Sequence, residues 1–476
     1  MPENNPSVPA AATAGGGWTP ALWGLLLVLA GNMLIDALEV SVALVALPAI
    51  GDDLGLAPDR LHWVVSGFAA GFGGVLLLGG RVVALLGRRP VYLTALAVFA
   101  AASLAGALAD DPALLIATRF VKGVCAALTA PTGLAIILSA FPQGPARNRA
   151  VSVYSLFGAA GFATGLLLSG ALTEIGWRWT FAFPAPVALL LFAAAVRLVP
   201  GDPPDRSGSG SGLAGAAGLT AVTLLLVHAI GSVPRTGWGA PSTAGAFALA
   251  GVLAVLLARR ELTGPRPLAD PRLLAHAPLV RSALGAAALN GSHIGILMLS
   301  ALHLQRHAGL GPWQTGLAFL PASAPLVLSA LYSGRMVARL GPARPIAAGA
   351  AAAALGYALY PRDPSAPLEY ATDVLPTMLL IGAAFVLAFT ALHVQATSTA
   401  PAGRQAEAGG LYQTAVQLGA ALTTALTAAV YTAAGHGAAV LLVTAVGTAG
   451  LVVALPGLRR ETRTDPLPAD LTRRRT

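Results

Sequence analysis

The chain has 476 residues, of which 56% are apolar and only 10% are charged. Soluble domains carry about 25% charged residues, so this composition excludes an ordinary water-soluble enzyme, and the many apolar residues exclude a disordered chain. A net charge of +9 would suggest a nucleic-acid partner for a soluble protein. Here the basic residues lie in short loops between apolar runs, as membrane topology requires, so we expect no nucleic acid.

Apolar runs recur along the chain and are long enough to cross a bilayer, for which a helix needs about 20 mostly apolar residues. They predict an all-α polytopic membrane protein with fourteen spans. Residues 1–17 contain no Lys or Arg, unlike the start of a secretory signal. The predicted spans are 21–47, 61–83, 91–109, 113–138, 150–172, 179–198, 213–232, 243–259, 281–304, 314–334, 346–361, 374–399, 406–432 and 436–456.

Basic residues are concentrated in alternate loops. If the N-terminus lies inside, 22 of the 29 Lys and Arg residues fall in cytoplasmic segments and five in external loops. Cytoplasmic loops are enriched in Lys and Arg, so we expect both termini in the cytoplasm. An odd number of spans would break this alternation.

Two of the predicted cytoplasmic loops resemble each other. Residues 80–87 and 334–341 share the frame Gly-Arg-x-Val-Ala-x-Leu-Gly, and each follows one apolar span and precedes another. Repeated halves that move against each other are what alternating access requires. The repeat therefore predicts a transporter built from two related halves.

A series of motifs carries a family resemblance. In chain order they are LIDALE and ALP within 34–48, GGR and GRR within 79–89, RFVKG at 119–123 and WRWTF at 177–181. Together they resemble the motifs of the major facilitator superfamily, in its fourteen-helix drug:proton antiporter branch. The likeness extends from about residue 21 to residue 456.

The resemblance implies the major facilitator fold, with two six-helix bundles and two extra helices that are central in the sequence. Residues 21–200 would form the N-terminal bundle and residues 279–456 the C-terminal bundle. Residues 201–278 would be a linker that contains the two extra transmembrane helices. Residues 1–20 and 457–476 would be cytoplasmic tails.

Several positions depart from the family's motifs. Ala84 stands where the loop signature usually has an acid, Lys122 where the fourth helix usually has Gln, and Leu166 where the fifth-helix motif usually has Pro. These changes leave open whether coupling is altered. Ordinary helix packing is the alternative role for the motif glycines, and loop anchoring for the arginines. The residues predicted to act in gating are Gly80, Arg81, Gly87, Arg88, Gly161, Gly165 and Gly170.

Asp36 and Glu39 are two acidic residues in the middle of a predicted span, 21–47. They are three residues apart and so share a helix face. A carboxylate in hydrocarbon costs several kcal/mol unless it is protonated, paired or hydrated, which suits the pair to proton coupling. The resemblance implies that Arg119 assists this proton transfer. The alternative is a permanent ion pair with Arg119 or Lys122, which are three apart in the fourth span.

Polar residues in the spans are candidates for the lining of a substrate cavity between the two bundles. Asn290 and His293 share one helix face, and so do Gln413 and Gln417. The alternative role for these four residues is to form hydrogen bonds between helices. Lys122 is the fifth candidate, and the alternative for it is that its side chain extends toward water. Scattered histidines and a single cysteine predict no metal site and no disulfide.

Motifs of enzymes, such as a P-loop or a nucleophile elbow, are absent from the sequence. We therefore predict no enzyme activity, no catalytic residues and no cofactor, with a proton gradient as the energy source. The predicted function is secondary active efflux, in which a small amphipathic drug or secondary metabolite is exchanged for protons. The expected partners are that substrate, protons and the lipid bilayer, and the protein is expected to be monomeric.

An excess of Arg, with a single Lys in the chain, indicates a high-GC bacterial genome. We expect the protein in the bacterial plasma membrane, where export of a self-made antibiotic is one role it could have. Two alternatives remain open. One is a proton symporter or uniporter of the same fold that takes up a small molecule, and the other is a membrane sensor that does not transport.

Overall fold

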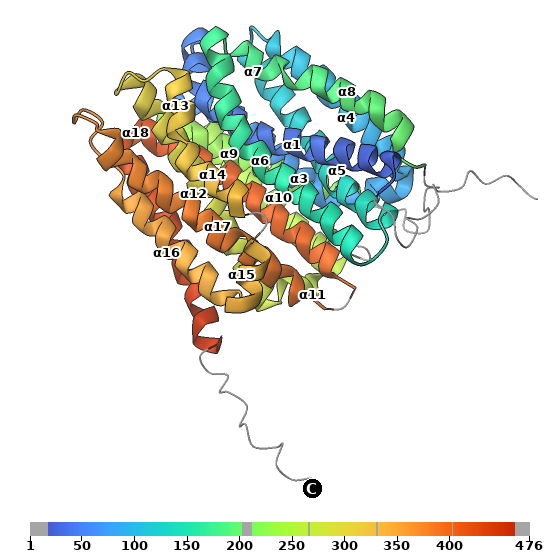
Figure 1. The fold of residues 1–476 in the computed structure, drawn as a ribbon. Helices are drawn as coiled ribbons and strands as arrows, with labels where there is room; N and C mark the ends of the chain where they lie inside the picture. The colour runs from blue at the N-terminus through green and yellow to red at the C-terminus, as the bar shows by residue number, and fades with distance from the viewer. Residues whose placement is uncertain (1–17, 202–211, 265–266, 330–331, 402, 462–476) are drawn as a thin grey trace, which may run out of the picture.

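The computed structural model describes residues 18–201, 212–264, 267–329, 332–401 and 403–461. Within these ranges the chain is helical and contains no β-strand. Eleven of the described helices are long and apolar enough to cross a membrane. The predicted fold class, an all-α polytopic membrane protein, is confirmed (Figure 1).

Proline at the first helical turn starts many of the helices, because its missing N–H group has no intrahelical partner there. Thr19 and Asp111 cap the helices that follow them by accepting a hydrogen bond from a backbone N–H. The helices up to residue 198 are α1 Pro20–Asp53, α2 Pro58–Leu61, α3 Trp63–Leu86, α4 Arg88–Ala107, α5 Pro112–Ala140, α6 Pro145–Ile175, α7 Arg178–Ala182 and α8 Pro184–Leu198.

Beyond residue 211 the helices are more interrupted. A short π-helix, Tyr370–Val374, leads into α17. The α-helices are α9 Gly212–Thr236, α10 Pro241–Thr263, α11 Pro271–Leu274, α12 Ala277–Arg306, α13 Pro312–Ala318, α14 Leu320–Ser329, α15 Ser333–Leu340, α16 Ala343–Leu359, α17 Leu375–Ser398 and α18 Gln405–Glu461.

The number of spans differs between sequence and structure for identifiable reasons. The predicted span 314–334 is divided between α13 and α14, and α16 has only 17 residues. In α18 the backbone is not helical at Gly435, where φ is 83°, and this kink lies between the last two predicted spans. The total of fourteen spans therefore stays a prediction.

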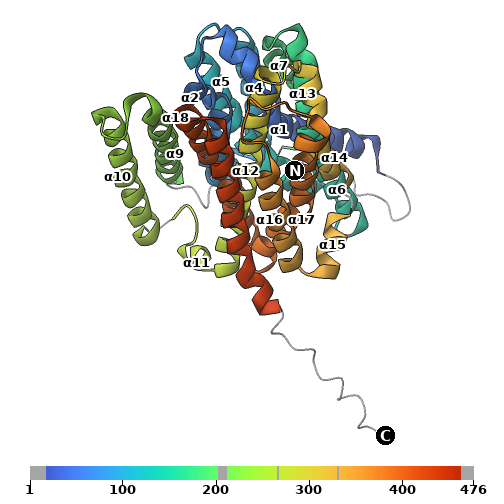
Figure 2. The same ribbon diagram turned by 90° about the vertical axis from the view of Figure 1, so that its left-hand side faces the viewer.

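Long helices pack side by side in the body of the molecule. α1 packs against α6, α3 against α5, and α12 against α18. The two extra helices lie at one side, with α10 outermost (Figure 2). α9 contacts both α3 and α18, so it touches helices from early and late parts of the chain. The predicted division into two six-helix bundles stays a prediction.

Glycines on α6 allow the close approach of neighbouring helices. A Cβ atom added to Gly161 would overlap the carbonyl oxygen of Leu34, and one added to Gly165 would overlap Oγ of Ser41. At Gly170 it would lie 2.8 Å from the carbonyl oxygen of Pro312, on α13. These glycines therefore serve helix packing in this conformation, the alternative considered for them from the sequence.

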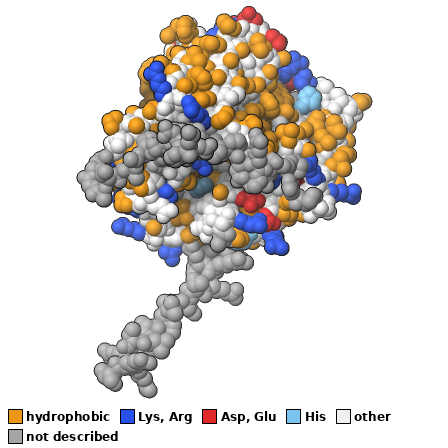
Figure 3. Space-filling model, turned by 90° about the vertical axis from the view of Figure 1, so that its right-hand side faces the viewer, with side chains coloured by type: hydrophobic (Ala, Val, Ile, Leu, Met, Phe, Trp, Pro, Cys, Tyr) orange, Lys and Arg blue, Asp and Glu red, His pale blue; other side chains and the backbone are white. Residues whose placement is uncertain are grey.

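The surface of the molecule is largely apolar, as expected for helices in lipid. Figure 3 shows one face, on which blue basic side chains are spread around orange apolar ones and outnumber the red acidic ones. The orientation of this face in the membrane, and of both termini, stays a prediction.

Candidate functional site

The structure brings the four predicted intramembrane charges close together. Asp36 and Glu39 lie on α1, and Arg119 and Lys122 lie on α5. All four side chains are buried, with Asp36 the most exposed at 3%. A buried charge needs a partner to offset its desolvation, so the contacts of each group decide its role.

Glu39 forms ion pairs with both cations. Arg119 pairs with its Oε2 atom, and Nζ of Lys122 lies 2.5 Å from its Oε1 atom. Arg119 also donates to the backbone oxygens of Glu39, at 2.8 Å, and of Val64 on α3, at 2.7 Å. The guanidinium group thus ties α1 and α3 to α5, which is the ion-pair alternative raised from the sequence.

Aromatic rings enclose the two cations. The guanidinium carbon of Arg119 lies 4.9 Å from the ring centre of Phe68, and Nζ of Lys122 lies 5.0 Å from that of Phe99. Cations over ring faces are stabilised by the ring quadrupole. Glu39 with Arg119 and Lys122 therefore forms a packed cluster with a formal charge of +1, and Lys122 does not snorkel toward water.

Asp36 is held differently. Its Oδ2 atom accepts hydrogen bonds from Nδ2 of Asn32, at 2.9 Å, and from Oγ1 of Thr129, at 2.8 Å. Both donors are neutral, so these bonds do not commit the carboxyl group to permanent ionisation. Asn32 was not among the predicted site residues. Its position four residues before Asp36, on the same helix face, is the signal that could have identified it as a hydrogen-bond donor to Asp36.

The second predicted polar group lies on α12 and α18. Nδ2 of Asn290 donates to the carbonyl oxygen of Val416 at 3.0 Å, which is a helix-to-helix hydrogen bond. Gln417 is buried, and its Oε1 atom has no hydrogen-bond partner among the described residues. Gln413, one turn earlier, is half-buried. Asn290 thus takes the structural role, whereas Gln417 has an unused acceptor.

His293 sits where distant helices meet. Its ring centre lies 5.7 Å from that of Phe162 on α6 and 4.7 Å from that of Phe385 on α17. The side chain is 2% exposed, and Nδ1 has no hydrogen-bond partner in the described part of the chain. An unsatisfied buried polar atom costs about 1–3 kcal/mol, so a bound water or ligand would be a natural partner.

The predicted gating residues near the loop after α3 make long-range contacts. Arg81 donates to the carbonyl oxygens of Pro267 and Leu268, the latter at 3.3 Å. Arg88 donates to Oγ of Ser139 at 3.0 Å. Gly87 ends α3 with φ of 88°, which favours glycine. A Cβ atom at Gly80 would meet open space, so no packing contact requires glycine there.

Residues 267–270, called the bridging segment below, connect α3 to α18. Arg81 of α3 holds Pro267 and Leu268, while Asp270 pairs with Arg404. The backbone N–H of Asp270 donates to Glu407 of α18 at 2.5 Å. From the sequence this stretch was expected only as part of a linker. Hydrogen bonds and ion pairs between residues far apart in the chain leave no periodic pattern that could predict them.

The opposite end of the bundle is also joined across the chain. Arg306 of α12 pairs with Asp52 of α1 at 3.1 Å, and Gln305 donates to the carbonyl oxygen of Val45 at 2.9 Å. The backbone N–H of Trp313 donates to Glu174 at 3.0 Å. Helices of both halves therefore meet at both ends in this conformation.

None of the residues predicted to line the substrate cavity lines any of three pockets in the described part of the structure. Two lie among α12, α16, α17 and α18, and neither is lined by the charged cluster. The third lies between α1 and α12, where Leu47, Met298 and Tyr431 are among its lining residues. Helices of both predicted halves therefore line this third pocket, α1 and α2 from one half and α12 and α18 from the other.

Charged residues buried within membrane-length helices mark substrate or ion pathways, as in membrane transporters. The sequence matches the family described as Major Facilitator Superfamily over residues 29–424. The chain belongs to this superfamily, and the resemblance inferred from its motifs is confirmed.

Several curated relatives are resistance and export proteins. The puromycin resistance protein pur8 of Streptomyces alboniger is 34% identical over 87% of this chain and 82% of its own length. The cephamycin export protein CmcT of Amycolatopsis lactamdurans is 32% identical over 90% of this chain and 89% of its own. The lincomycin resistance protein of Streptomyces lincolnensis is 32% identical over 84% and 82%.

Solved structures support the fold. A peptide transporter POT in complex with sulfate has a TM-score of 0.70, at 16% identity, and covers 96% of this chain and 97% of its own. The nucleoside transporter NupG has a TM-score of 0.63, at 15% identity, over 92% and 99%. At such low identity the likeness concerns the fold alone.

Proposed function

We propose that the protein is a secondary active exporter in the bacterial plasma membrane. It moves a small amphipathic drug or secondary metabolite out of the cell in exchange for protons. Family membership and relatives named for puromycin, cephamycin and lincomycin resistance or export support this direction. The excess of basic residues in alternate loops supports a topology with both termini in the cytoplasm.

The observation that carries the coupling proposal is the contrast between Asp36 and Glu39. Glu39 is bound to two cations, whereas Asp36 is held by neutral donors one helical turn away. With Asp36 ionised, the four groups sum to zero, and with Asp36 protonated they sum to +1. One proton thus changes the formal charge of a water-poor site, where electrostatic energies are large.

This change of charge provides a route to alternating access. A proton shifts a conformational equilibrium only if it binds the two conformations with different affinity. Hydration of Asp36 in one conformation and burial in the other would supply that difference. Arg119 would then act as a positioning residue, because it fixes α1 against α3 and α5 while Asp36 titrates.

Substrate contact is proposed for His293 and Gln417. Each has a buried polar atom without a partner among the described residues. The aromatic rings of Phe162 and Phe385 flank His293 and offer apolar surface beside it. This combination suits an amphipathic molecule, which a few polar groups would orient within an otherwise apolar site.

Uptake is the second candidate function. It is favoured by one observation, the replacement of the usual motif proline by Leu166, which is buried against its neighbours. A membrane sensor without transport would bind a ligand and show no counterflow.

Everted membrane vesicles separate these functions. With an acidic lumen, an exporter accumulates puromycin inside the vesicle, and an uncoupler abolishes the gradient. Accumulation driven by an alkaline lumen would support proton symport, and saturable binding without accumulation or counterflow would support a sensor.

A further inference from the structure

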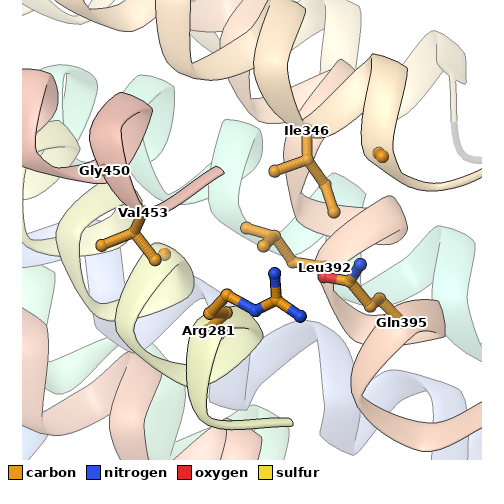
Figure 4. Close-up of a pocket in the computed structure, with 8 residues that line it drawn as sticks. Arg281, Ile346, Leu392, Gln395, Gly450 and Val453 are labelled. Atoms are coloured by element: carbon orange, nitrogen blue, oxygen red, sulfur yellow. The ribbon is translucent and has the colours of Figure 1, made fainter. Parts of the chain in front are cut away.

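A pocket at one end of α12 has no role in the proposed transport cycle. It is a shallow hollow open to the surroundings, with a cavity volume of about 20 Å³. Figure 4 shows it between α12, α16, α17 and the end of α18. Its lining residues are Arg281, Gly285, Ala343, Ile346, Leu392, Gln395, Gly450 and Val453.

A second pocket continues the first along α12. The two share Gly285, Ile346, Leu392 and Gly450, and the second, also with a cavity volume of about 20 Å³, reaches Ser292. Together they are called the α12 groove. From Arg281 to Ser292 the helix rises about 16 Å. That length is close to one leaflet of a hydrocarbon layer about 30 Å thick.

The α12 groove is polar at one end only. Arg281 and Gln395 point toward each other across the first pocket (Figure 4). Oγ of Ser282 donates to Oε1 of Gln395 at 2.9 Å, so the amide NH₂ group remains on the side available for an acceptor. Neither pocket is lined by Asp or Glu. The rest of the groove is mainly apolar.

The corresponding place in the N-terminal half is filled. The repeated loops 80–87 and 334–341 are separated by a fixed number of residues. The same separation pairs Tyr92 with Ile346, Leu96 with Ala350 and Phe99 with Ala353. Tyr92, Leu96 and Phe99 are buried in apolar clusters. In the groove, Ala350 and Ala353 replace two of these larger side chains and leave space beside Leu289.

We propose that the α12 groove binds one anionic phospholipid of the cytoplasmic leaflet. The lipid phosphate would bind Arg281 and Gln395, and an acyl chain would lie along the apolar part toward Ser292. Basic pockets between membrane helices on the cytoplasmic side bind anionic lipid head groups. Free phosphate would leave the apolar length unused, and a zwitterionic lipid would be attracted less by the single arginine, whose Nε atom donates to the carbonyl oxygen of Ala277. The proposal rests on the proposed membrane topology, not on export.

Native mass spectrometry of the purified full chain tests the proposal. The probes are dioleoylphosphatidylglycerol, dioleoylphosphatidylcholine and glycerol phosphate. We expect one tightly retained phosphatidylglycerol, with affinity reduced about fivefold in Arg281→Gln. Arg344→Gln is the matched control, because Arg344 is exposed nearby and lines neither pocket. Ala350→Leu should abolish retention by filling the groove while Arg281 remains.

Four results would overturn the proposal: equal retention of phosphatidylcholine, equal binding of glycerol phosphate, equal losses in Arg281→Gln and Arg344→Gln, or a lipid-free dimer formed through this face. Arg281→Lys guards against misfolding, because it keeps the charge and should recover most of the retention. If Arg281→Gln and Arg281→Lys lose the lipid equally while both remain monodisperse, the charge is not what binds the head group.

Discussion

The ammonium nitrogen of Lys122 lies 2.5 Å from Oε1 of Glu39, and Arg119 holds the other oxygen of the same carboxylate. One carboxylate therefore pairs with two cations, and Asp36, one turn earlier on the same helix, accepts hydrogen bonds from neutral donors. This unequal sharing assigns a structural role to Glu39 and leaves Asp36 as the proposed proton carrier.

Glu39→Gln should destabilise the protein strongly. The substitution leaves Arg119 and Lys122 without a counter-charge, and breaking a buried ion pair costs about 3–5 kcal/mol. Thermal unfolding in detergent would show a lower midpoint than wild type. The double variant Glu39→Gln/Lys122→Met removes one stranded cation and should recover part of the loss. Equal stability of Glu39→Gln and wild type would contradict the structural role.

His293→Phe should impair transport more than stability. The substitution keeps a ring between Phe162 and Phe385 and removes a nitrogen that has no described partner. Cells should become less resistant to whichever of puromycin, lincomycin and cephamycin the wild-type protein exports, while the unfolding midpoint stays the same or rises.

Asn290→Leu provides the comparison for His293→Phe, because it breaks the hydrogen bond to Val416 and should lower stability by about 1 kcal/mol. Full resistance to puromycin, lincomycin and cephamycin in His293→Phe cells would argue against substrate contact by this side chain.

Gly165→Ala should disturb the packing of α6 on α1. The added methyl group would overlap Oγ of Ser41, and overpacking of this kind costs about 1–3 kcal/mol. Gly80→Ala is the control, because its new methyl group meets open space. Thermal unfolding of both variants checks the expectation, which fails if their midpoints change equally.

Asp270→Asn should loosen the bridging segment. It removes the charge that pairs with Arg404, while Arg81 still holds Pro267 and Leu268. We expect faster thiol labelling of a cysteine placed at the half-buried Gln413, measured in a Cys125→Ala background. Labelling as slow as in the parent protein would show that the bridging segment does not restrain α18.

Much of the fold followed from the sequence because its signals are local. Apolar runs predicted the helices, and ordered motifs such as those containing Asp36 and Arg119 predicted the family. Broken helices obscured the span count, since an apolar run does not show that α13 and α14 are separate.

The candidate site was predictable only in part. Spacing of three residues placed Asp36 with Glu39 and Arg119 with Lys122 on shared helix faces. The choice of Glu39 as the partner of both cations depends on how α1 and α5 are aligned, which no local pattern encodes. The contacts of Arg81 with Pro267 and Leu268 were missed for the same reason.

The most direct measurement of proton coupling uses Asp36→Asn in proteoliposomes with an acidic lumen. Asparagine preserves the size and hydrogen-bonding capacity of the side chain but cannot release a proton in this range. With a substrate that the wild-type protein exports, we predict that acid-driven accumulation is lost while counterflow of that substrate persists. Acid-driven accumulation at the wild-type rate and extent would contradict the assignment of Asp36 as the proton carrier.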